Sequence, residues 1–378
     1  MSIAASSRSG GAQAVRLFLC GDVMIGRGVD QILAAPSPPK LYEEYVSSAE
    51  EYVRLAEAAS GPIPRQVDPS YIWGDALAEL RAEAPDASIV NLETSVTHSE
   101  TAEAKAINYR ASPQNAKCLL DLGVDCCALA NNHVLDWGRS GLIETLDTLD
   151  RLGVAFAGAG RTIDDARRPA ILDIPRKARV VVLSFALPDS GTPFDWAATR
   201  ATPGVNLLPD LSPTSADRAC DWARNAVRPG DILVASIHWG ANWGYRVSNA
   251  QRQFAHRLIE QGGAAIIHGH SSHHPKGIEV YRNRLILYGC GDFLNDYEGI
   301  GGFESFRGDL SPMYFAHIEA ASGDLLRLRL FPLRMRCMRL ERASAADAEW
   351  LAQRLDRESA PFGVRVLRHE DGALSASW

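Results

Sequence analysis

The stretch IIHGHSSHHP, residues 266–275, decides how the fold of this chain is interpreted. Two isoleucines end an apolar run and lead into four of the chain's ten histidines, His268, His270, His273 and His274. A short apolar run that ends at glycine predicts a buried strand. Because neighbouring strand residues point to opposite faces, we expect one or two of these imidazoles to face a common site. Ligands of open α/β sheets gather at the carboxyl ends of strands, so the stretch predicts a functional site there.

Similar apolar runs alternate with amphipathic helical patterns along most of the chain. This alternation is typical of an α/β protein with a largely parallel or mixed sheet covered by helices. The expected strands are residues 15–20, 87–92, 125–130, 154–159, 179–185, 231–239, 264–269, 278–281 and 284–289. The expected helices are residues 49–59, 73–83, 113–123, 139–153, 215–227 and 249–263.

The C-terminal part has a different pattern, which favours antiparallel strands and one closing helix. The strands are expected at 313–320, 324–340 and 364–369, and the helix at 345–359. We therefore expect a flexible N-terminal tail over residues 1–14, a catalytic domain over 15–333, and a C-terminal extension over 334–378 packed on the same domain.

Composition narrows the class of partner. The chain has 378 residues, 46% of them hydrophobic, and a formal net charge of -7. A negative chain lacks the basic face that nucleic acids or anionic membranes require, so we expect neither as a partner. The seven cysteines are scattered without CxxC spacing, which favours reduced thiols. Together with the lack of an apolar leader in the first residues, this predicts a cytoplasmic protein.

Polar side chains follow four other expected strands at the point where each run ends. Taken alone, an aspartate there is as well explained by a turn or a helix cap, and a lone histidine by the core. Carboxylates, amides and imidazoles from five strand ends are instead the ligands that divalent cations need. The residues in question are Asp22, Glu93, Asn132, His133, Asp136 and His238.

The same segments occur in a familiar order. GDVMIGR, NLETSV, ANNHVLDWG, IHWG and GHSSHHPKGIEVYRNRLILYGCGDF resemble motifs of the CapA family, which is associated with poly-γ-glutamate capsule synthesis. The resemblance covers roughly residues 15 to 300. It implies a calcineurin-like metallo-dependent phosphatase fold, a β-sandwich flanked by helices with a metal centre at one sheet edge.

The resemblance also implies roles for individual residues. His133 is similar to the acid–base histidine of the family, steadied by Asp136. We also count His273, from the histidine cluster, as a ligand. The expected metal-site residues are therefore Asp22, Glu93, Asn132, His238 and His273.

Three departures from the family pattern bear on the metal. Ser271-Ser272-His273 stands where the family has His-Pro-His, Asn242 where it has glutamate, and Asp292 where Gly-Asn-Phe has asparagine. One nitrogen ligand is lost and one carboxylate is gained. We therefore expect a harder, oxygen-rich site that favours Ca²⁺, with Mn²⁺ or Zn²⁺ as alternatives, and no organic cofactor.

Three functions are candidates for this chain, and the resemblance implies the first two. Soluble relatives resemble lasso-peptide epimerases, which invert a C-terminal tryptophan of a ribosomal precursor peptide, and this isomerase is our first expectation. Inversion needs acid–base groups on both faces of a carbon. The second candidate is a metal-dependent hydrolase of a phosphoester or an amide, with His133 protonating the leaving group; a binding module without activity is the third. The expected acid–base residues are His133, Asp136, Asp22, His270, His273 and Asp292.

Aromatic residues near the fourth motif are candidates for substrate binding. Trp239, Trp243 and Tyr245, with Asn242 beside them, would stack on an indole if they face the site. Packing in the core or at its rim explains the three aromatic residues equally well.

Overall fold

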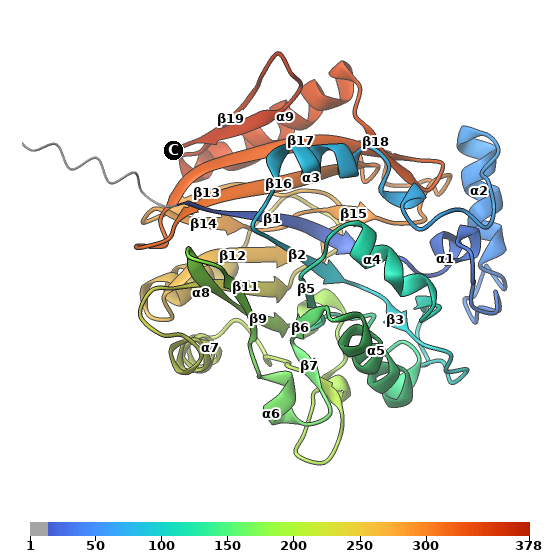
Figure 1. Cartoon of the computed structure of the whole chain (residues 1–378), viewed down its shortest axis with the longest axis horizontal. Helices are drawn as coiled ribbons and strands as arrows, with labels where there is room; N and C mark the ends of the chain where they lie inside the picture. The colour runs from blue at the N-terminus through green and yellow to red at the C-terminus, as the bar shows by residue number, and fades with distance from the viewer. Residues whose placement is uncertain (1–13) are drawn as a thin grey trace, which may run out of the picture.

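The structure is a computed structural model that describes residues 14–378. Two β-sheets pack face to face, and helices cover both outer sides (Figure 1). The predicted N-terminal tail lies outside the described residues except for Ala14, which begins the first strand. The mixed α/β architecture predicted from the alternation of strands and helices is confirmed.

The larger sheet is mixed, with a parallel half and an antiparallel half. Its order is β19 (Arg365–Arg368), β20 (Leu374–Ser377), β17 (Leu325–Arg336), β16 (Leu310–Glu319), β1 (Ala14–Val23), β2 (Ala87–Leu92), β5 (Cys126–Ala128) and β6 (Ala155–Ala157), with β15 (Asp292–Leu294) beside β1 and β18 (Arg339–Arg342) beside β17. Strands β1, β2, β5 and β6 run parallel, whereas β16 pairs antiparallel with β1 and β17.

The smaller sheet carries the stretch of sequence quoted first. Its order is β13 (Ile278–Tyr281), β14 (Arg284–Leu287), β12 (Ala264–His270), β11 (Asp231–His238), β9 (Ala178–Ala186) and β8 (Ala170–Ile174). Strands β9, β11, β12 and β14 are parallel. Two short pairs complete the strands of the described part, β3 (Ser95–Val96) with β4 (Arg110–Ala111) and β7 (Ala159–Gly160) with β10 (Gly204–Val205).

Alternation along each strand sorts its side chains between two cores. On β1, Leu17 and Leu19 join the core between the sheets, whereas Phe18 points to the core under the helices. On β9, Val182 faces the other sheet and Val181 faces the helices outside. The period of two in a strand therefore explains why runs that are hydrophobic throughout are buried on both faces.

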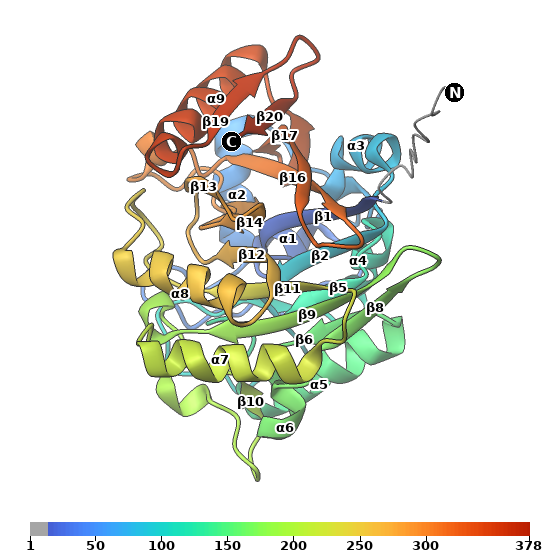
Figure 2. The same ribbon diagram turned by 90° about the vertical axis from the view of Figure 1, so that its left-hand side faces the viewer.

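Helices cover the outer faces. On the smaller sheet, α7 (Pro213–Ala226) and α8 (Asn249–Glu260) lie side by side (Figure 2). Ser248 and Gln251 form a capping box that fixes the start of α8. Five helices contribute residues to the core outside the larger sheet: α1 (Gly28–Ile32), α2 (Glu50–Ser60), α3 (Ala76–Glu83), α4 (Cys118–Asp121) and α5 (Gly138–Leu152). The two remaining helices, α6 (Ile163–Ala166) and α9 (Ala345–Ser359), contribute no residue to this core.

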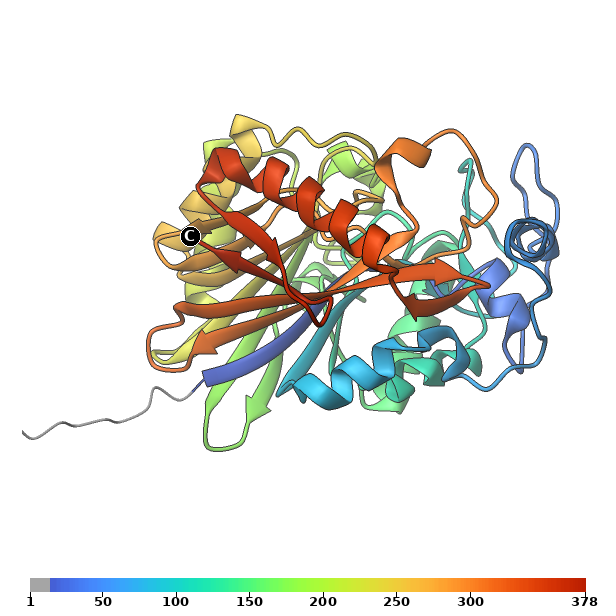
Figure 3. The ribbon, with the colours of Figure 1, turned by 90° about the horizontal axis from the view of Figure 1, so that it is seen from above.

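The C-terminal segment is continuous with the larger sheet. Helix α9 crosses above the orange strands β16 and β17 when the molecule is seen from above (Figure 3), and Leu351 and Leu355 join the core between the sheets. The predicted boundary at residues 333/334 falls inside β17. Antiparallel pairing of β16, β17, β18, β19 and β20 agrees with the pattern expected for this segment.

Some predicted elements differ in extent. Residues 154–159 form two strands, β6 and β7, because the chain turns at Gly158 with φ 96°. Residues 113–123 form only a short 3-10 turn followed by the four-residue α4. Strands β8 and β15 were not predicted. In the described part of the chain, no helix has the length and apolar character required to cross a bilayer.

Candidate metal centre and acid–base residues

The carboxyl ends of strands from both sheets meet at one place. Asp22 lies one residue before the end of β1, beside Asp292 at the start of β15, and His238 and His270 are paired at the ends of β11 and β12. Glu93 follows β2 directly. All five side chains are buried. Parallel strands in two facing sheets therefore bring together residues that are up to 270 positions apart (Asp292 minus Asp22) in sequence.

A close approach of backbone at Gly21 makes this arrangement feasible. A β-carbon at Gly21 would lie 1.6 Å from the carbonyl oxygen of Gly291, so no other residue fits there. The register of β1 against β2 also shifts between Leu19 and Asp22. Glycine and the irregular register together place Asp22 against Asp292, with their Cα atoms paired across the two strands.

The cluster holds more negative charge than its surroundings neutralise. Burial, with Asp292 nearby, raises the pKa of Asp22 to about 7, and burial together with Asp22 and Asp292 raises the pKa of Glu93 well above its ordinary value. The Oε2 atom of Glu93 has no hydrogen-bond partner. Buried carboxylates in contact are stable only if protonated or compensated by a cation. The donor set therefore fits a divalent cation.

Two groups of potential ligands share Asp22. Asp22, His238 and His270 form one group and Asp22, His273 and Asp292 the other, and the ligand atoms within each group lie within 4.8 Å of one another. His238 Nε2 lies 2.9 Å from Asn132 Oδ1 and 3.7 Å from Glu93 Oε1. The structure thus brings together all five residues predicted for the metal site, and it adds His270 and Asp292 to them.

Two asparagines that were not assigned a role hold this geometry. Asn91 Nδ2 donates to Asp22 Oδ1 at 2.7 Å, and Asn131 Nδ2 donates to Asn91 Oδ1 at 3.1 Å. The Oδ1 atom of Asn131 accepts from the backbone N–H groups of His133 and Val134. This chain of amides connects the ends of β1, β2 and β5, so the loop that carries His133 is fixed relative to the carboxylates.

His133 is a neutral acid–base candidate. Its Nδ1 lies 2.6 Å from Asp136 Oδ2, and its Nε2 lies 3.8 Å from Glu93 Oε1. Lys105 Nζ donates to Asp136 Oδ1 at 2.6 Å, and the backbone N–H of Tyr109 donates to Oδ2. Burial lowers the pKa of His133 to about 4, with Asp136 opposing and Lys105 adding to the effect. The neutral ring keeps its proton on Nδ1, which donates it in a hydrogen bond to Asp136. The Nε2 atom is therefore a free base that faces the carboxylates.

Lys105 was not predicted as a site residue. It lies in a loop, 28 positions (133 minus 105) before His133, with no apolar run ahead of it to mark the end of a strand. Only the tertiary structure carries its ammonium group to Asp136. The one signal in the sequence is a lysine inside an otherwise acidic segment, which is weak.

A second histidine–carboxylate pair lies on the other side of the cluster. His273 Nδ1 is 2.9 Å from Asp292 Oδ1, and Asn242 contacts His273 Nε2 at 3.0 Å. Burial lowers the pKa of His273, but Asp292 and Asp22 outweigh it and the net pKa is raised. Asn295 donates to the remaining oxygen of Asp292 at 2.9 Å.

The four histidines of the quoted stretch divide into two kinds. His270 and His273 face the cluster. His274 accepts from the backbone N–H of Gly244 at Nε2 and lies 3.2 Å from the Pro275 carbonyl at Nδ1, so it fastens a loop. His268 lies 2.7 Å from the Cys20 carbonyl, in the core between the sheets.

The aromatic residues also divide. Trp239 is 1% exposed and its indole N–H donates to the Tyr288 carbonyl, so it belongs to the core and is closed to a substrate. Tyr245 packs on His274, with ring centroids 4.4 Å apart. Trp243 alone borders the cluster, 5.3 Å from His273 and stacked on the half-exposed Phe303.

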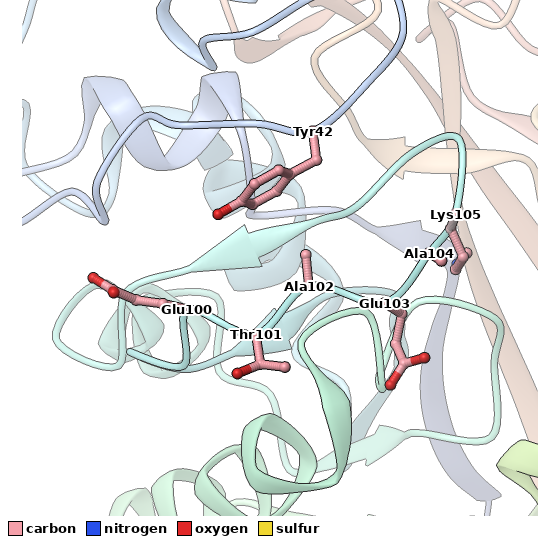
Figure 4. Close-up of a pocket in the computed structure, with 7 residues that line it drawn as sticks. All are labelled: Tyr42, Glu100, Thr101, Ala102, Glu103, Ala104 and Lys105. Carbon is pink, nitrogen blue, oxygen red and sulfur yellow. The ribbon is translucent and has the colours of Figure 1, made fainter.

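An open depression of about 720 Å³ lies beside Lys105. It is lined by Tyr42 and the segment from Glu100 to Lys105. Figure 4 shows the Tyr42 ring extending from its loop toward this segment, with Ala102 pointing to the ring. Lys105 lines this depression and also donates to Asp136, so a single residue lies between the depression and the acid–base pair.

Comparison with known proteins identifies the family. The family described as bacterial capsule synthesis protein PGA_cap matches residues 16–297. The chain belongs to this family. A probable polyglutamine synthesis accessory protein of Mycobacterium tuberculosis is 48% identical over 370 residues, 97% of each chain. The PGA biosynthesis protein CapA of Bacillus subtilis is 28% identical over 278 residues, 73% of this chain and 62% of the relative.

Membership in the capsule synthesis family corrects the first expected function. The prediction of a peptide epimerase is wrong, because relatives that match this chain along most of its length are named for polyglutamine or PGA synthesis. That prediction gave weight to three aromatic residues, of which Trp239 is buried in the core. The second candidate, a hydrolase of the capsule synthesis family, agrees better with the relatives.

Proposed function

We propose that this chain is a metal-dependent hydrolase that cleaves amide bonds of a glutamate- or glutamine-containing polymer during the synthesis of that polymer. The names of the relatives support the polymer, whose units are joined by amides. The observation that carries the proposal is the free Nε2 atom of His133 at the border of a buried carboxylate cluster. Fold membership alone would not indicate a reaction.

The cation would be held by oxygen and imidazole groups together. Its ligands would come from Asp22, Glu93, Asn132, His238 and His270. Imidazole is a poor ligand for Ca²⁺, which takes oxygen atoms, so the two histidines move our preference from Ca²⁺ to Mn²⁺. When bound, such a cation supplies a Lewis acid that polarises the scissile carbonyl.

His133 would move the proton. Its Nδ1–H is held by Asp136, so Nε2 would accept the proton of the attacking water and then give it to the leaving nitrogen. Lys105 donates to Asp136 and holds its carboxylate in place, which fixes the orientation of the imidazole ring. The depression beside Lys105 would admit the polymer.

A cleavage assay tests this function. The full-length protein, stripped of metal and reloaded with Mn²⁺, Ca²⁺ or Zn²⁺, is incubated with γ-linked oligoglutamate, α-linked oligoglutamate and oligoglutamine. We expect new amino groups and shorter chains by mass spectrometry with Mn²⁺ and at least one of the three polymers. Bis-p-nitrophenyl phosphate is tested in parallel as a phosphoester substrate. Cleavage of this ester with all three polymers intact would contradict the amide assignment.

A further inference from the structure

A lysine beside the loop that follows β11 has no role in the acid–base pairs. Lys276 directly follows the quoted stretch and is 4% exposed. Among the described residues, its ammonium group forms neither a hydrogen bond nor an ion pair, and burial lowers its pKa although Asp189 opposes this. Because a buried ammonium group without a partner is costly, this position indicates a partner that binds from outside the chain.

Two glycines make room for the lysine side chain. A β-carbon at Gly289 would lie 3.2 Å from Cγ of Lys276, and a β-carbon at Gly240 would lie 3.8 Å from its Nζ. Gly240 also has φ 78°, a conformation that favours glycine. The aliphatic part of Lys276 therefore runs past Gly289, and its ammonium group ends beside Gly240.

Gln251 offers a second donor at the same place. Its Oε1 accepts from the backbone N–H of Ser248 in the capping box of α8, which fixes the orientation of the amide group. Its Nε2 atom is buried, has no hydrogen-bond partner in the described part of the chain, and would lie 2.9 Å from a β-carbon at Gly240. Two nitrogens that need an acceptor thus face one space, which exists because residue 240 has no side chain.

The charges around this space favour an anion. Lys276 brings a positive charge, and Gln251 is the third residue of α8, so the positive end of the helix dipole is close. Asp189 is the opposing charge, but it is exposed, and its Oδ1 accepts from the backbone N–H of Gly240 at 3.0 Å. A carboxylate, which has two acceptor oxygens, would satisfy the ammonium group and the amide donor together.

One residue connects this space to the carboxylate cluster. Ser271 Oγ donates to the Gly240 carbonyl at 3.1 Å, and the Ser271 backbone N–H donates to Asp22 Oδ2 at 3.1 Å. Ser271 has φ 98°, which is strained for a residue with a side chain, so the surrounding structure imposes this link. Gly240 also follows His238 by two positions. A polymer with an amide at the cluster can therefore place a neighbouring unit at this space.

We propose that Lys276, Gln251 and Gly240 form a carboxylate-binding subsite, which takes the free carboxylate of a glutamate unit next to the amide at the cluster. The identity of the polymer in this inference rests on the proposed function. The subsite gives the protein a preference for glutamate over glutamine units, because a neutral carboxamide gains less from the ammonium group than a carboxylate does.

Binding to the metal-free full-length protein tests the subsite without cleavage. The probes are γ-linked triglutamate and the same oligomer with its carboxylates converted into amides, each titrated by isothermal calorimetry. We expect wild type to bind the acidic oligomer about tenfold or more tightly than the amidated one. Lys276→Met should weaken binding of the acidic oligomer about tenfold, equivalent to one hydrogen bond to a charged group, and leave the amidated one unchanged.

Gln251→Glu is a second variant that keeps the fold. It retains the oxygen that caps α8 but replaces the unpartnered Nε2 donor with a carboxylate oxygen. We expect the acidic oligomer to bind this variant about tenfold more weakly as well. Lys117→Met removes the same charge as Lys276→Met from an exposed position and is the matched control, for which we expect wild-type affinities.

Three results overturn the subsite. They are wild-type affinity for the acidic oligomer in Gln251→Glu or in a folded Lys276→Met, an equal loss of affinity for both oligomers in either variant, and a wild-type protein that binds neither oligomer. Cleavage is not part of this measurement. A protein that binds the acidic oligomer through Lys276 but cleaves no polymer would contradict the proposed hydrolase and leave the subsite in place.

Discussion

Two histidine–carboxylate pairs flank the carboxylate cluster. The same kind of hydrogen bond, from Nδ1 to a carboxylate oxygen, joins the residues of each pair, but the two imidazole rings differ in charge. His133 Nδ1 is 2.6 Å from Asp136, and His273 Nδ1 is 2.9 Å from Asp292. The pKa of His133 is lowered to about 4, whereas that of His273 is raised. A shorter bond to a carboxylate thus accompanies the more neutral ring.

The neighbours of each carboxylate explain the difference. Asp136 is shared with Lys105, whose positive charge offsets the carboxylate and lowers the pKa of His133. Asp292 instead hydrogen-bonds to His273 and to the neutral Asn295, and Asp22 adds a second negative charge that raises the pKa of His273. The identity of the hydrogen-bond partner therefore does not set the charge of a buried histidine; the balance of nearby charges does.

The largest expected effect separates the pairs by activity. His133→Ala should lower the rate of polymer cleavage about 10³-fold, within the range for loss of a general acid–base group, because only His133 offers a free base. His273→Ala should cost less, since its pair is the protonated one. Both rates are measured at saturating Mn²⁺. Equal losses in the two variants would remove the functional distinction between the pairs.

The second prediction concerns stability and pH in the metal-free protein. The folded pKa of His133 is depressed to about 4 from the ordinary 6.5, so its contribution is present above pH 6.5 and is lost as the pH falls toward 4. At about 1.4 kcal/mol per pH unit, the loss reaches about 3 kcal/mol. The unfolding free energies of wild type and His133→Gln, measured from pH 4 to 7, should converge by this amount as the pH falls.

His273 should show the opposite sign in the same experiment. Its folded pKa is raised, so its contribution is present below pH 6.5 and is lost as the pH rises through the folded pKa. The gap between wild type and His273→Gln should therefore be constant at low pH and narrow at higher pH. Parallel curves for the two variants would contradict the assigned charges.

A third prediction concerns Lys105, whose ammonium group contacts the carboxylate of the first pair. Lys105→Met should raise the pKa of His133 and bring it closer to His273, because the lowering influence of the ammonium group is lost. Asp136 would lose one partner while buried, at a cost of about 1 to 3 kcal/mol in unfolding free energy. The pKa is followed by NMR of the imidazole. Lys117→Met, at an exposed position, is the control and should change neither quantity.

The smallest effect is expected from Asp292→Asn. The pKa of His273 should fall, because its principal carboxylate becomes neutral while the hydrogen-bonding shape is kept. We expect polymer cleavage to change by about tenfold or less, equivalent to one hydrogen bond to a charged group. A loss as large as that of His133→Ala would show that the second pair is also catalytic.

Much of the fold could be predicted from the sequence because its signals are local. The apolar runs at 87–92 and 278–281 give strands with the expected bounds, and 345–359 gives the expected helix. The short β15, by contrast, has no strand signal of its own. It forms because Gly21 lets β1 approach Gly291. Segments stabilised by a neighbour that is distant in sequence are not visible in a local pattern.

The sequence by itself determined that carboxylate, amide and imidazole side chains follow buried strands, because a strand end is recognisable from its own residues. Only the tertiary structure decided which of them meet. Lys105 comes from a loop without a strand signal, and Trp239, predicted to meet a substrate, turned into the core. The charge of each histidine was decided last, since it depends on charges that come together only when the two sheets pack.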